Sequence, residues 1–146
     1  EGWALYAERV AKVDMGFYEA DPLGDLGRLQ AEIFRAVRLV VDTGMHAKHW
    51  SREQAIEYMV AKTGMTEAEV TREIERYVVW PGQATSYKVG QLAMLRMREQ
   101  AEKELGPKFD LRGFHEVVLM NGSMPLAVLE EVVQEWVKSQ QSRPSA

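Results

Sequence analysis

The sequence contains no cysteine and no long run of hydrophobic residues. Without cysteine, the chain forms no disulfide and offers no thiolate ligand to a metal. Its aliphatic runs, such as residues 39–41, are far shorter than a bilayer requires, so no membrane span is expected. The cellular compartment stays unknown, because a chain without cysteine suits reducing and oxidising surroundings alike, and any signal peptide would lie ahead of residue 1.

An excess of basic residues is also missing. Lysine and arginine number 18 against 22 acidic residues, which gives a net charge of −4, and the two signs are mixed along the chain. A nucleic-acid-binding protein normally carries a basic patch, so no nucleic-acid partner is expected. The 146 residues, 46% of them hydrophobic and 27% charged, are typical of an ordinary globular domain.

No segment alternates polar and apolar residues in the pattern of a strand, whereas helical spacing recurs throughout. We therefore predict an all-α fold of about seven helices in an irregular bundle. Glycine at position 44 is expected to end the second helix, and capping boxes at Ser51 and Thr66 to open the next two. The expected helices cover roughly residues 1–13, 25–41, 51–63, 66–80, 83–105, 110–121 and 123–139.

The domain prediction is a single all-α domain over residues 1–138. The last eight residues, SQQSRPSA (139–146), are polar and rich in serine and glutamine. Such a terminus buries too little apolar surface to hold one conformation, so a disordered tail is expected there.

Several strings are more informative than the periodicity. They include EGWALYAE (1–8), EVTREIERYVVWPGQATSYKVGQL (69–92) and KFDLRGFHEVVLMNGSMPLAVLE (108–130). These strings resemble the bacterial family known as domain of unknown function 885. The resemblance runs from Glu1 to about Trp136 and so covers nearly the whole chain.

The resemblance implies a zinc peptidase of the gluzincin type, all-helical and similar to angiotensin-converting enzyme and the oligopeptidases. In such proteins the two histidines of an HExxH motif bind zinc, the glutamate of that motif is the general base, and a glutamate on a following helix is the third ligand. The resemblance assigns that last glutamate to Glu1. Glu8, two helical turns further on, would then hydrogen-bond a ligand histidine from behind, with a surface ion pair as the alternative.

The HExxH motif itself is absent. The three histidines are His46, His49 and His115, and position 119, four residues after His115, is leucine. We therefore expect the chain to be the C-terminal portion of a larger metallopeptidase-like protein, lacking an N-terminal half that carries the motif. One carboxylate does not hold zinc, so no tightly bound zinc is expected in this chain alone.

The resemblance also suggests residues that would stabilise the oxyanion of the reaction. Tyr87 is the first candidate, followed by Tyr77, with His46 and Gln83 beside them. For each, the alternative is a packing role, and His49 is interpreted as a helix-terminal residue. Arg38 and Lys88 are interpreted as helix-surface charges, with binding of a substrate carboxylate as the alternative.

The resulting hypothesis is that the chain forms one wall of a peptide cleft and supplies the third zinc ligand, inactive in isolation. Its partners would be the N-terminal half and a peptide substrate. The alternative is a non-catalytic helical module for protein interaction or packing. An exposed apolar patch is also expected near Trp3, Tyr6 and residues 77–87, and a homodimer would form through it.

Overall fold

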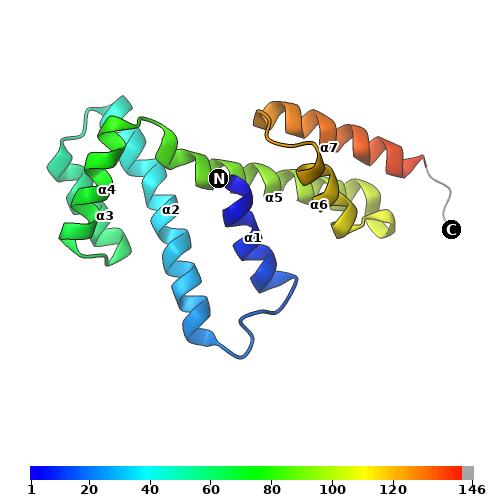
Figure 1. The fold of residues 1–146 in the computed structure, drawn as a ribbon, viewed down its shortest axis with the longest axis horizontal. Coiled ribbons are helices and arrows are strands. Elements are labelled where there is room, and N and C mark those ends of the chain that lie inside the picture. The colour runs from blue at the N-terminus through cyan, green and yellow to red at the C-terminus, as the bar shows by residue number, and fades with distance from the viewer. Residues whose placement is uncertain (143–146) are drawn as a thin grey trace. The chain divides into compact units, whose positions relative to one another are not determined.

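The computed structural model of the protein describes residues 1–142, and within them the chain forms seven α-helices, two short 3₁₀ helices and no strand (Figure 1). The all-α prediction is confirmed. The chain divides into two compact units, unit 1 from Glu1 to Gln91 and unit 2 from Leu92 onward. The single domain expected over residues 1–138 stays a prediction. No helix of the described part is both long enough and apolar enough to cross a membrane.

Unit 1 contains the first four helices and the start of the fifth. These elements are α1 (Gly2–Val13), α2 (Pro22–Lys48), α3 (Arg52–Thr63), α4 (Glu67–Val79), the 3₁₀ helix η1 (Gln83–Thr85) and the first six residues of α5 (Ser86–Leu105). Both predicted capping boxes are present. Ser51 pairs with Gln54, and Thr66 pairs with Glu69, so each pair satisfies two backbone N–H groups at a helix start.

The second helix is longer than predicted, because Gly44 does not end it. α2 continues to Lys48 and ends at His49, which adopts a left-handed conformation with φ 56°. A Cβ on Gly44 would lie 2.7 Å from the Trp50 ring. Glycine is thus needed here for close packing inside the helix, where the sequence pattern suggested a terminator.

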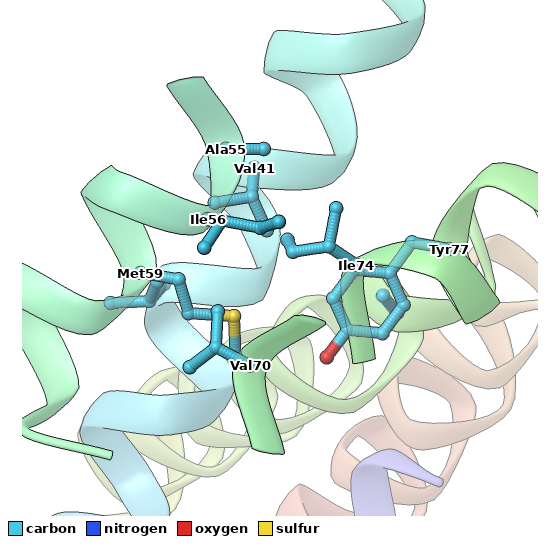
Figure 2. Close-up of a cluster of buried hydrophobic side chains, with 9 residues drawn as sticks. Val41, Ala55, Ile56, Met59, Val70, Ile74 and Tyr77 are labelled. Carbon is cyan, nitrogen blue, oxygen red and sulfur yellow. The ribbon is translucent and has the colours of Figure 1, made fainter. Parts of the chain in front are cut away.

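The core of unit 1 lies where α2, α3 and α4 meet. Figure 2 shows its side chains pointing toward one another from these three helices. The buried members are Val37, Val41, Ala55, Ile56, Met59, Val70, Ile74, Tyr77 and Ala84. Burial of a large aliphatic or aromatic side chain contributes roughly 1.5–3 kcal/mol, so this cluster anchors α4 and the turn that follows it.

Unit 2 is built from the rest of α5, the 3₁₀ helix η2 (Gly106–Lys108), α6 (Leu111–Met120) and α7 (Leu126–Gln141). Asp110 caps α6, accepting from the backbone N–H groups of Arg112 and Gly113. The rings of Phe109, Phe114 and Trp136 contact one another. α7 extends two residues beyond its predicted end, into the expected tail, whose residues 143–146 lie outside the described part.

The exposed apolar surface of unit 1 agrees with the expectation only in part. Tyr6 and Tyr77 are fully buried, so the predicted patch is wrong at those two residues. Val79 and Trp80 are exposed, in agreement with the expectation for residues 77–87. A second exposed group lies along α2 and consists of Leu26, Leu29, Ile33 and Val40, which we call the α2 stripe.

Candidate functional site

Glu1 is positioned by an unusually close crossing of α1 and α5. A Cβ on Gly2 would lie 2.5 Å from the Cα of Gly90, and a Cβ on Gly90 would lie 2.7 Å from the Cα of Gly2. Only two glycines allow backbones to approach so closely. Next to the crossing, the buried Gln91 donates from Nε2 to the carbonyl of Leu5, at 3.1 Å. The first turn of α1 is therefore held against the start of α5.

The Trp80-Pro81-Gly82 turn is fixed by a buried carboxylate. Both oxygens of Asp42, which is 3% exposed, accept from the backbone N–H of Gly82, at 3.1 and 3.0 Å. Gly82 has φ 82°, a conformation that favours glycine. This anchor on α2 sets the direction in which η1 leaves the turn, and η1 begins with Gln83.

Gln83 joins the N-terminus of the chain to α2 and α4. Its Nε2 donates to Oε1 of Glu1 at 3.3 Å. Its Oε1 lies 3.4 Å from Nη2 of Arg38 and 3.5 Å from Nη1 of Arg76, both at the long limit of a hydrogen bond. The structure thus brings two predicted site residues, Glu1 and Gln83, into contact across 82 positions of sequence.

Tyr77 and His46 form a neighbouring pair, but the hydroxyl of Tyr77 is already engaged. It donates to Oε2 of Glu73 at 2.7 Å. Burial and this hydrogen bond raise the pKa of the Tyr77 phenol. His46 Nε2 lies 3.0 Å from the backbone carbonyl of Tyr77, and because a carbonyl only accepts, Nε2 carries the proton.

Tyr87 lies at the start of α5, half-buried, with its ring over two guanidinium groups. Cζ of Arg38 is 4.5 Å from the ring centroid and Cζ of Arg35 is 5.8 Å from it, both within the range of a cation–π contact. Among the described residues, the Tyr87 hydroxyl has no hydrogen-bond partner. Of the two predicted tyrosines, Tyr87 is therefore the one with a free donor.

Glu1 is the residue that the family resemblance assigns to a metal. In residues 1–142 no group of three or more histidine, cysteine, aspartate or glutamate side chains is arranged to hold a metal ion. Glu1 is exposed, with one oxygen held by Gln83, which suits one ligand of a larger set but does not complete a site. Glu8 is half-buried on the same helix, and within the described part no hydrogen bond or ion pair engages it.

Sequence reasoning missed the importance of two residues of α2. Arg38 was interpreted as a surface charge, yet it is only 3% exposed and lies among Phe34, Tyr77 and Tyr87. Asp42 was not singled out at all. The available hint was their spacing, since positions 38 and 42 lie about one helical turn apart, on the side of α2 that carries the buried Val41.

The comparisons with known proteins identify the family. Residues 1–133 match the family described as bacterial protein of unknown function, DUF885, and the chain belongs to it. The chain is also similar to a solved structure described as "the putative lipoprotein from Colwellia psychrerythraea", with 62% identity and a TM-score of 0.93 over 95% of this chain. No curated protein matches.

The chain spans only 24% of the length of that Colwellia protein. At 62% identity the two folds correspond closely. The part of the Colwellia protein that has no counterpart here is about three times as long as the matched part. The family description assigns no activity to such a longer protein.

Proposed function

We propose that this chain is the C-terminal part of a zinc-dependent, metallopeptidase-like protein and forms one wall of its peptide cleft. In that longer protein, Glu1 supplies one metal ligand and a separate segment supplies the two histidines. The chain by itself is not an active enzyme. Its partners in this proposal are that separate segment and a peptide substrate.

The contact between Glu1 and Gln83 carries the proposal. The family resemblance selected Glu1, Gln83, Tyr77, Tyr87 and His46 from separate stretches of sequence. Gln83 touches Glu1, His46 touches the backbone of Tyr77, and the rings of Tyr77 and Tyr87 flank the same guanidinium. Since Gln83 also contacts Arg38, the five selected residues are connected through one chain of contacts, which supports a shared site.

The chemistry divides between the metal and the side chains of this chain. Zinc, when bound in the longer protein, would lower the pKa of its water and polarise the scissile carbonyl. Gln83 orients the Glu1 carboxylate by occupying one of its oxygens. Tyr87 offers an unengaged hydroxyl to the developing oxyanion. The Nε2–H of His46 is engaged by the carbonyl of Tyr77, so its proposed role as a second donor requires that contact to break.

Two substitutions in the longer protein test these assignments separately. Glu1→Gln removes a charged ligand, so zinc content should fall first and peptidase activity with it. Tyr87→Phe keeps the ring and removes the hydroxyl, so kcat and kcat/KM should fall together by about 10²–10³ with unchanged zinc content. Zinc is measured by elemental analysis after dialysis, and activity on a peptide library.

Matched controls are Glu57→Gln, an exposed glutamate on α3, and Tyr58→Phe, which removes a hydroxyl from the same unit. Both should leave zinc content and activity unchanged. Full zinc content in Glu1→Gln together with near-full activity in Tyr87→Phe would contradict both assignments. The non-catalytic helical module would then be the better reading, and the α2 stripe is the observation that favours it.

A further inference from the structure

Arg35 and Arg38 form a pair of cations on one face of α2. They are three residues apart, so their side chains are neighbours on the helix surface. Each guanidinium carbon lies 5.4 Å from the centroid of the Phe34 ring, and both face the ring of Tyr87. Arg38 is 97% buried, since its exposed fraction is 3%, and Arg35 is half-buried.

Neither of these cations forms a close ion pair within the described residues, although the Glu73 carboxylate acts on Arg38 at longer range. The Nε atoms of both arginines are buried and have no hydrogen-bond partner, and in the described part of the chain no carboxylate lies within ion-pair distance of either group. The single side-chain hydrogen bond of Arg38 is the long one to Gln83. Arg35 donates from Nη1 to the carbonyl of Ala31 at 3.2 Å.

Other arginines of the same unit, by contrast, do form ion pairs. Arg28 pairs with Asp25 and Glu32 at 2.8 and 2.9 Å, and Arg76 pairs with Glu73 at 2.7 Å. A buried charge without an ion pair and a buried donor without an acceptor both destabilise a folded chain. Two such groups side by side indicate a site whose anionic partner comes from outside this chain.

We propose that Arg35 and Arg38 bind the carboxylate of a ligand, and that this ligand is the C-terminus of a peptide. The inference deepens the proposed function and rests on it for the peptide. A guanidinium fork matches the two oxygens of a carboxylate, and the aromatic rings around Arg38 hold its guanidinium in place. The two arginines match the negative charge of the ligand, and the aromatic faces restrict the plane of its carboxylate.

The position of the site sets the substrate class. Gln83 contacts Arg38 through its Oε1 and Glu1 through its Nε2, so one side chain bridges the carboxylate site and the exposed Glu1. A peptide held at its C-terminus by the arginine pair would present a bond near that end to Glu1. The substrates are therefore peptides with a free C-terminal carboxylate, cleaved close to it.

The binding step can be tested on the 146-residue chain without zinc or cleavage. The probes are N-acetyl-Ala-Ala with a free carboxylate, the same dipeptide as its C-terminal amide, and inorganic phosphate. The readout is the NMR resonances of the arginine Nε–H groups. We expect the free acid to shift those of Arg35 and Arg38 saturably, with little shift from the amide and weaker binding of phosphate.

Substitutions assign the effect to the pair. Arg35→Gln and Arg38→Gln should each weaken binding of the free acid at least about tenfold, the scale of one charge-assisted hydrogen bond. Arg9→Gln removes an identical charge from an exposed position of α1 and should leave binding unchanged. If circular dichroism shows that Arg38→Gln is unfolded, Arg35→Gln and the comparison of acid with amide decide the question.

Three outcomes would overturn the proposal: no saturable shift with the free acid, equal binding of acid and amide, or an equal loss in Arg9→Gln. Tighter binding of phosphate than of the acid would overturn the carboxylate assignment. Because none of these measurements involves zinc, their failure is distinct from a failure of the Glu1→Gln experiment.

Discussion

At the scale of single residues, the Glu73 carboxylate engages the hydroxyl of Tyr77 in a hydrogen bond. Burial alone would raise the pKa of the Glu73 carboxyl, but hydrogen bonds from Arg76 and Tyr77 outweigh it and lower that pKa below its usual 4.5. The carboxylate is thus an acceptor for a fully buried phenol. This arrangement favours a structural role for Tyr77 and leaves Tyr87 as the better catalytic candidate.

A pH dependence of stability follows from this pair. A carboxyl whose pKa is lowered by folding stabilises the protein above its unfolded pKa, and the contribution is lost as the pH falls through the folded value. Glu73→Gln should therefore lower the free energy of unfolding by about 1 kcal/mol at pH 7, the difference between a charge-assisted and a neutral hydrogen bond. At pH 3 the two proteins should differ less.

Urea unfolding at the two pH values measures the effect. Glu57→Gln, on the exposed face of α3, is the control and should change stability little at either pH. An equal loss of stability in Glu73→Gln at both pH values would show that the ionised carboxylate contributes nothing.

At the scale of elements, the crossing of α1 and α5 decides where Glu1 lies. The two glycines of the crossing leave no room for a side chain in either helix. Gly90→Ala would force the helices apart, so we expect a loss of roughly 1–3 kcal/mol or more in stability and a displacement of Glu1 from Gln83. Thermal unfolding measures the first effect, and NMR of the Gln83 side-chain amide measures the second.

Gly27→Ala is the matched control, with the opposite expected sign. Gly27 lies within α2, and a Cβ there would meet nothing within 4 Å. Alanine is the better helix former by about 0.5–1 kcal/mol, so this change should stabilise the protein. A neutral effect of Gly90→Ala would mean that α1 tolerates a wider crossing.

The helix caps were predictable from the sequence, whereas the packing roles of the glycines in the helices were not. Ser51 with Gln54 and Thr66 with Glu69 act within four residues, so sequence alone identified both helix starts. Gly44 was misread because its reason lies in the ring of Trp50, which packs on it after the chain reverses. The same holds for Gly90, whose contact is 88 positions away.

At the scale of the whole molecule, the α2 stripe is an exposed apolar surface that a partner could cover. A groove of about 700 Å³ lies along it and is lined by Leu26, Leu29, Gln30, Glu32, Ile33, Ala36 and Lys88. The homodimer expected from the sequence stays a prediction, and we expect it to form through this groove. An exposed apolar face of this kind favours a second copy when the chain is alone in solution.

The double substitution Leu29→Gln and Ile33→Gln should shift the chain from dimer to monomer. Both side chains are about half exposed, so the melting temperature should change little. Light scattering coupled to size exclusion, over a range of concentrations, measures the mass. Leu119→Gln with Met120→Gln is the control, removing exposed apolar groups from unit 2. A monomeric wild type, or an equal effect of the control, would contradict this interface.

The sequence by itself determined the all-α class, most helix positions, the caps and the family. Each of these depends on local spacing, or on strings long enough to be recognised. Only the tertiary structure decided that Arg38 and Asp42 are buried, that Gln83 bridges Glu1 and Arg38, and that Tyr77 is engaged. Contacts between residues 1 and 83, or 42 and 82, form when helices pack, and helical periodicity specifies a buried face without specifying its neighbour.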